Sequence, residues 1–234
     1  MGTRHLICVF WKGKWVLAQY GQFDGYPDGQ GVRIFNFLSY AHNIDKLKIG
    51  LDHHIYEPTQ KELDAITAEC AAWDENRSVQ GLPYEPNMFG VNQLYPSLAR
   101  DTSAGILGII ARASQSGSED DTEGSSGTKP KKIPVFLDLE FANDTLFCEW
   151  AYVIDLDKEI LEIYSGGERK HDGHRFKDVG SEDAPVPAFI CSLRFSELYL
   201  MKGAEEFKEK VNEAIEGRSK AEGSSNVVDE QGVL

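Results

Sequence analysis

Two short apolar stretches near the start of the chain are rich in residues that favour β-strands. They are residues 4–10 (RHLICVF) and 14–20 (KWVLAQY), and Lys12 and Gly13 lie between them. Two such runs separated by a short glycine-containing turn predict a β-hairpin.

A second hairpin is predicted further along the chain. From Cys148 to Asp155 apolar and polar side chains alternate, Asp157 and Lys158 form a turn, and residues 160–164 form the returning strand. Alternation with a period of two is typical of strands whose faces differ in environment.

Four other segments carry apolar residues at the spacing of an α-helix. One of them has a clear start, because Thr59 is followed three residues later by Glu62, which is the signature of a capping box. Asp101 or Thr102 can cap another of them. The apolar positions that predict the four helices are Ile34, Phe35, Leu38 and Ala41; Leu63, Ile66, Cys70 and Trp73; Ile106, Ile109 and Ile110; and Phe207, Val211 and Ala214.

Two segments are predicted to lie outside the folded core. Residues 114–132 are polar and contain no apolar side chain, so they cannot bury enough surface to offset the entropy of ordering. We expect a disordered insert there and a flexible acidic and polar tail at 217–234. The remainder of 1–216 is predicted to be a single globular domain of the α+β class, with an antiparallel sheet and helices packed on it.

The composition narrows the range of functions. The chain has 234 residues and a net charge of −14, which argues against binding nucleic acid or an anionic membrane surface. Its four cysteines are far apart and form no CxxC pair, as expected for reduced and mostly buried thiols. No signal peptide and no bilayer-spanning apolar run is found in the sequence, so we expect a cytoplasmic protein.

The histidines do not predict a metal site. His53 and His54 are adjacent, and His171 and His174 flank an Asp-Gly pair, but neither spacing matches a metal-binding motif. We therefore expect surface histidines, and no metal or cofactor.

The stretch YGQFDGYPDGQG at 20–31 is the strongest candidate for a site. Its glycines match neither a dinucleotide-binding nor a P-loop pattern. A cluster of glycines indicates tight backbone geometry or close approach to another group. Two interpretations stay open, a loop packed on the core by its aromatic rings and a loop that binds a ligand. The polar and aromatic side chains that it offers are Tyr20, Gln22, Asp24, Tyr26 and Gln30.

The start of the chain, GTRHLICVFWKGKWVLAQYGQ, loosely resembles the opening of the N-terminal-nucleophile hydrolases, especially the proteasome-like threonine group. The resemblance covers about twenty residues. It implies a fold like that of these hydrolases, with Thr3 as the nucleophile and its own α-amine as the base. Cleavage between Gly2 and Thr3 would be needed to free that amine.

The chain as a whole resembles a family of small proteins from fungi, bacteria and phages. The resemblance lies in TRHLI, AQYGQFDGYPDGQG, RDTSAGIL and FCEWAYVIDLDKEILEIYSG, and it covers most of the chain outside the insert and the tail. It implies no activity. It adds to the candidates the residues in matching motifs: Arg4, Arg100, Asp101, Glu149 and Trp150.

Two functions are predicted as alternatives. The first is a cytoplasmic hydrolase or amide-processing enzyme that acts on a small molecule or peptide. Its catalytic residues are predicted to be Thr3, Asp24 and Arg4, and it would use either Thr3 or a water activated by Asp24. The second is a non-catalytic ligand-binding or protein-interaction module that uses loop 20–31. In both cases the ligand-binding residues are predicted to be Tyr20, Gln22, Tyr26, Gln30, Arg100, Asp101, Glu149 and Trp150.

Overall fold

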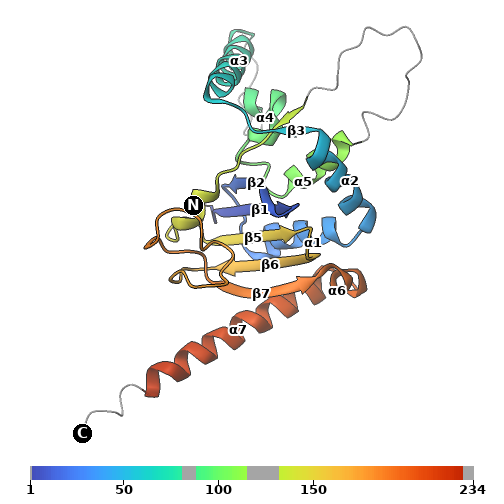
Figure 1. Cartoon of the computed structure of the whole chain (residues 1–234). Coiled ribbons are helices and arrows are strands. Elements are labelled where there is room, and N and C mark those ends of the chain that lie inside the picture. Colours follow the sequence, from blue (N-terminus) through green and yellow to red (C-terminus); the bar gives the residue numbers. More distant parts are fainter. Residues whose placement is uncertain (1, 81–87, 115–131, 229–234) are drawn as a thin grey trace.

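The protein is built around one five-stranded sheet (Figure 1). The structure is a computed structural model and describes residues 2–80, 88–114 and 132–228, so almost all of the predicted disordered insert lies outside the described residues. The strand order is β2-β1-β5-β6-β7. The strands are β1 (His5–Trp11), β2 (Lys14–Gly21), β5 (Trp150–Asp155), β6 (Ile160–Ser165) and β7 (Phe189–Arg194).

One pair of strands in this sheet departs from the predicted antiparallel pattern. Three of the four neighbouring pairs are antiparallel, but β1 and β5 run parallel, from His5 opposite Trp150 to Phe10 opposite Asp155. Parallel neighbours need a long crossover connection. Here the crossover is the chain between β2 and β5, and it contains several helices. The α+β prediction did not say which strands these helices connect.

Both predicted hairpins are confirmed, and one side chain links their turns. Lys12 and Gly13 have φ values of 54° and 73°, as the two central residues of a tight hairpin turn require. The carboxylate of Asp157, in the turn of the second hairpin, accepts hydrogen bonds from the backbone N–H groups of Lys12 and Gly13 at 2.9 and 2.8 Å.

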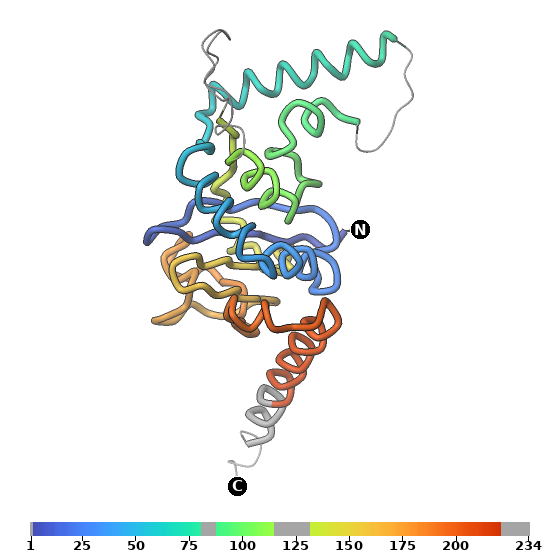
Figure 2. The backbone as a smooth tube through the Cα atoms, turned by 90° about the vertical axis from the view of Figure 1, so that its right-hand side faces the viewer, coloured from blue at the N-terminus to red at the C-terminus, as the bar shows by residue number. Residues whose placement is uncertain are grey.

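Helices cover one face of the sheet (Figures 1 and 2). Apolar side chains from β1, such as Ile7 and Val9, pack there against Ile34, Leu38 and Phe207 from the helices. These helices are α1 (Val32–Leu38), α2 (Ala41–His53), α5 (Gly105–Ala113), α6 (Phe195–Leu200) and α7 (Ala204–Val228). The last of them, α7, is longer than predicted. The sequence predicts that this helix ends near 216, but it continues to Val228.

The opposite face is covered by irregular chain rather than by helices. Leu6, Cys8 and Val153 face this side and pack against Phe176 and Val186 from the segment 166–188. The segment before β5 contributes one helical turn, η3 (Leu139–Asn143).

A smaller third cluster lies beyond β2. There Ile66 and Cys70 pack against Tyr95 and Leu98. The capping box predicted at Thr59 is present. The elements are β3 (Ile55–Tyr56), paired in parallel with β4 (Ile133–Pro134), α3 (Gln60–Val79), α4 (Gly90–Leu94) and η2 (Pro96–Leu98).

The four cysteines are free thiols, three of them buried. Among the described residues no helix is both long and apolar enough to cross a membrane.

Candidate functional site

Loop 20–31 connects β2 to α1 and contains one wide helical turn, η1 (Pro27–Gly31). Four hydrogen bonds fix its backbone to three other parts of the chain and to itself. Such anchoring leaves the loop few alternative conformations. The bonds run from Gln22 N–H to the Arg100 carbonyl, from Gly25 N–H to the Thr3 carbonyl, from Gln30 N–H to the Asp24 carbonyl, and from the Tyr152 hydroxyl to the Gly25 carbonyl, at 3.2, 2.9, 2.9 and 2.7 Å.

Gln30 holds the loop to the helical layer. Its side chain is buried, its Nε2 donates to the Phe23 carbonyl at 3.2 Å, and its Oε1 accepts from the Ala104 N–H at 3.2 Å. Both ends of the amide are therefore used within the protein. We assign Gln30 a structural role, although the sequence pattern placed it among the ligand-binding residues.

The glycines of the loop are explained by what lies beneath them. A Cβ on Gly21 would lie 2.1 Å from Nε2 of His5, and a Cβ on Gly25 would lie 2.8 Å from both the His5 Cβ and the Thr3 carbonyl oxygen. The loop backbone thus packs directly on the His5 ring, and only glycine leaves room for it.

His5 itself is a feature that sequence reasoning missed. The side chain is fully buried, and neither ring nitrogen has a hydrogen-bond partner among the described residues. Burial lowers the pKa of His5 to about 4, which the nearby Thr3 carbonyl and Asp24 carboxylate offset only in part. The imidazole is therefore neutral at ordinary pH.

Two aromatic rings of the loop point outward. Phe23 is 46% exposed and Tyr26 is 42% exposed. Asp24, between them, has a φ of 57°, and its Oδ1 accepts a hydrogen bond from the Tyr26 hydroxyl at 3.3 Å. The negative charge of Asp24, that hydrogen bond and, to a smaller extent, Asp28 raise the pKa of Tyr26.

Residues 2–4 connect these rings to a second exposed apolar pair, Leu146 and Phe147. Gly2 lies against the Phe23 ring, and the Arg4 guanidinium lies 4.6 Å from the centre of the Phe147 ring. We call Phe23, Tyr26, Leu146 and Phe147 the N-terminal aromatic surface.

Several predicted site residues come together in pairs rather than in one cluster. The Arg4 N–H donates to Glu149 Oε1 at 3.0 Å, and the Tyr20 hydroxyl donates to Gln22. Arg100 Nε and Asp101 Oδ1 are 3.9 Å apart. Trp150 stacks on Tyr152 with 6.4 Å between ring centres.

A cavity of about 1420 Å³ lies elsewhere, lined by residues of β1, β2, β6 and β7 and by the segments 137–140 and 168–180. None of the residues predicted as catalytic or ligand-binding lines it. Its walls include Trp15, Tyr164 and Arg175.

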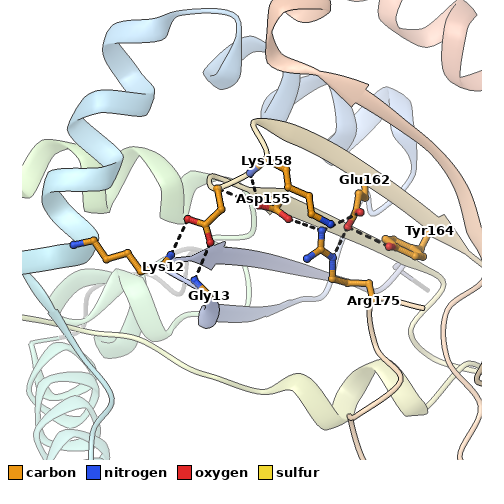
Figure 3. A network of polar contacts seen from close by, with 8 residues as sticks. Lys12, Gly13, Asp155, Lys158, Glu162, Tyr164 and Arg175 are labelled. Atoms are coloured by element: carbon orange, nitrogen blue, oxygen red, sulfur yellow. Dashed lines mark hydrogen bonds and ion pairs between the residues drawn. The ribbon is translucent and has the colours of Figure 1, made fainter. Parts of the chain in front are cut away.

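Arg175 is held by two carboxylates beside this cavity (Figure 3). Its Nε and Nη2 bind the two oxygens of Glu162 at 2.7 and 3.0 Å, and Nη2 also binds Asp155 at 2.5 Å. Asp155 in turn accepts the backbone N–H groups of Asp157 and Lys158, at the end of β5. The network ties segment 166–188 to the sheet, and its carboxylates are used within the protein.

The prediction that His174 lies on the surface is wrong. It is only 5% exposed, because segment 166–188 folds back over the sheet. Its Nδ1 accepts the Phe176 N–H at 3.1 Å, so Nε2 carries the proton and lies 3.1 Å from both the Pro187 carbonyl and Glu168 Oε1. No group of His, Cys, Asp and Glu side chains within the described residues could hold a metal ion.

Comparison of the chain with models of protein families, with curated proteins and with solved structures finds no match.

Proposed function

We propose that the protein is an interaction module that binds a peptide or protein through its N-terminal aromatic surface. The observation that carries the proposal is the exposure of Phe23 and Tyr26 on a loop whose backbone is anchored to Thr3, Arg100 and Tyr152. A rigid loop loses little conformational entropy on binding. Most of the free energy gained by burying its rings against a partner therefore contributes to the affinity. Exposed aromatic side chains of this kind are enriched among the residues that dominate binding energy.

The extent of the surface favours a macromolecular partner. Phe23 and Tyr26 come from one loop, Leu146 and Phe147 from a turn far away in the sequence, and residues 2–4 lie between them. An extended partner can contact both segments at once. The cavity of about 1420 Å³ is formed by other residues, so it does not supply a small-molecule pocket here.

The test compares capture by two variants of the full chain. The first carries Phe23→Ser and Tyr26→Ser. The matched control carries Tyr40→Ser and Leu200→Ser, two side chains that are 66% and 83% exposed elsewhere on the molecule. Each protein is immobilised and incubated with an extract of the cells that produce it, and bound proteins are identified by mass spectrometry.

We expect a protein retained by the wild type and the control to be lost with the loop variant, while circular dichroism shows all three folded. If wild type and loop variant retain the same proteins, the loop is not the recognition surface.

A second candidate is the hydrolase with Thr3 as its nucleophile. The observation that favours it is the position of Gly2, where a Cβ would lie 2.4 Å from the Gln22 carbonyl oxygen and 2.5 Å from the Phe23 ring. The bond that must break is therefore held against the loop that contains Asp24. Intact-mass measurement of the purified protein tests it: a chain that starts at Thr3 supports the enzyme, and a chain that starts at Met1 or Gly2 rules out Thr3 as an N-terminal nucleophile.

A further inference from the structure

A groove of about 430 Å³ between α1 and α5 brings two arginines together. Arg33 comes from α1, directly after the glycine-rich loop, and Arg112 comes from the last turn of α5. Phe37 and Ile109 supply apolar wall. We call it the arginine groove.

Both guanidinium groups belong to exposed residues, and no carboxylate matches their charges within the described part of the chain. Acidic residues outnumber basic ones by 38 to 24. Even so, neither Arg33 nor Arg112 makes an ion pair or a hydrogen bond within the described residues. Two such positive charges on one concave surface repel each other unless an anion lies between them.

Two of the residues with which α5 lines the groove are glycines, so no side chain covers the helix backbone at these positions. Gly105 and Gly108 are three residues apart, and both line the groove. Gly108 lies inside the helix, where glycine costs about 1 kcal/mol relative to alanine, whereas Gly105 is its first residue. A glycine at such a position therefore calls for a packing reason or for an approaching group.

Packing within the protein does not require either glycine. At Gly105 the nearest atom to an added Cβ is 3.7 Å away, and at Gly108 it is the flexible end of Arg112, at 3.3 Å. Gly50 of α2 is the contrast, because a Cβ there would lie 2.2 Å from the Ile110 carbonyl oxygen. Gly50 is needed for helix packing, whereas a methyl group at Gly105 would meet no close contact and one at Gly108 would meet only the end of the Arg112 side chain.

We propose that the arginine groove binds a small organic oxyanion, a phosphate monoester or a carboxylate, whose apolar part contacts Phe37 and Ile109. Planar guanidinium groups bind such anions through paired hydrogen bonds. The net charge of −14 repels anions in general, and it repels a nucleic-acid polymer far more strongly than a small anion that carries one or two charges.

Phenyl phosphate, benzoate and inorganic phosphate are the probes, and isothermal titration calorimetry on the full chain is the measurement. We expect phenyl phosphate to bind more tightly than inorganic phosphate, because only the former reaches the apolar wall. Binding of benzoate as well indicates a general oxyanion site, and binding of phenyl phosphate alone indicates a phosphate site. No binding of any probe to the wild type overturns the proposal.

Two variants and a control locate the site. Arg33→Gln with Arg112→Gln is expected to weaken binding at least tenfold. The control, Lys61→Gln with Arg169→Gln, removes the same charge from two exposed positions elsewhere and is expected to bind like the wild type. Equal losses in both double variants would mean that only the overall charge matters.

Gly108→Ala separates the groove from fold stability. Alanine favours the helix, so the melting temperature without ligand is expected to stay the same or rise. The added methyl group narrows the groove beside Arg112, so the affinity for phenyl phosphate is expected to fall severalfold. Unchanged affinity in this variant would show that the ligand does not approach α5.

Discussion

Two irregular segments of the molecule are fixed to the sheet in different ways. Loop 20–31 covers the neutral and unpartnered ring of His5 and is held mainly by backbone hydrogen bonds. Segment 166–188 is fixed through Arg175, whose charge is matched by Glu162 and Asp155. Loop 20–31 covers a group that must stay uncharged. Segment 166–188 depends on groups that must stay charged, although it also contains His174, whose pKa is lowered by burial. The two segments should therefore respond differently to substitution and to pH.

The ion-pair network should show the largest effect. Burial alone would lower the pKa of Arg175, but its bonds to Glu162 and Asp155 raise it above its ordinary value, so the guanidinium stays charged. Arg175→Met leaves Asp155, which is fully buried, without its counter-charge. We expect a loss of about 3–5 kcal/mol in the free energy of unfolding, measured by urea denaturation.

Lys177→Met is the control for Arg175→Met, because Lys177 is an exposed neighbour in the same segment. It should cost less than about 0.5 kcal/mol. A loss below 1 kcal/mol for Arg175→Met would show that the network is not what holds segment 166–188.

The next effect concerns acid and the loop 20–31, through His5. The pKa of His5 is lowered from 6.5 to about 4 in the folded protein. Its contribution to stability is complete above pH 6.5 and is lost as pH falls toward 4, because in that window the unfolded chain binds a proton that the folded chain excludes. The difference corresponds to about 3 kcal/mol.

His5→Leu should flatten this dependence between pH 6.5 and 4 in urea melts, whereas His42→Leu, at an exposed position, should leave it in place. An equally steep acid loss in the His5 variant would assign the effect to other groups.

Loss of the two hydrogen bonds made by the Gln30 side chain should have an intermediate effect on stability. Gln30→Leu leaves the Ala104 N–H and the Phe23 carbonyl without their partner. We expect a loss of about 1–3 kcal/mol in the free energy of unfolding. Gln60→Leu, on the exposed start of α3, should stay within about 0.5 kcal/mol. A neutral result for Gln30→Leu would return this residue to the ligand-binding candidates.

The smallest effect should come from the exposed part of the loop. Asp24→Asn removes the main cause of the raised pKa of Tyr26, so ultraviolet titration should show that pKa falling toward its ordinary value. Stability should change by no more than about 0.5 kcal/mol, since both side chains are exposed. No movement of the Tyr26 titration would mean that the two groups do not interact in solution.

Local features of the fold followed from the sequence, and long-range ones did not. The hairpin turn at Lys12-Gly13 and the cap at Thr59 depend on neighbours a few residues away, and both were predicted. The helix α2 was not predicted, although Ile44, Leu47 and Leu51 are buried at helical spacing. The parallel pairing of β1 with β5 also depends on segments far apart in the chain, which periodicity does not reveal.

The candidate site shows the same division. The sequence identified loop 20–31 as a place of tight backbone geometry, and the structure gives the reason in His5. It did not show that Gln30 would be buried, nor that Arg175, in a polar stretch typical of a surface loop, would pair with Asp155. Arg33 and Arg112 lie far apart in the sequence, one in α1 and the other in α5. Only the packing of α1 on α5 brings them to one groove.

The parallel pairing of β1 with β5 has a consequence for biosynthesis. A ribosome releases the first hairpin with one side of β1 unpaired, and the strand that completes it is made only after more than half of the chain has followed. An unpaired strand edge readily pairs with another chain. Nascent copies on the same polysome would thus compete with β5 for β1. Slow translation should therefore lower the yield of folded protein, and a chaperone bound to the hairpin should raise it.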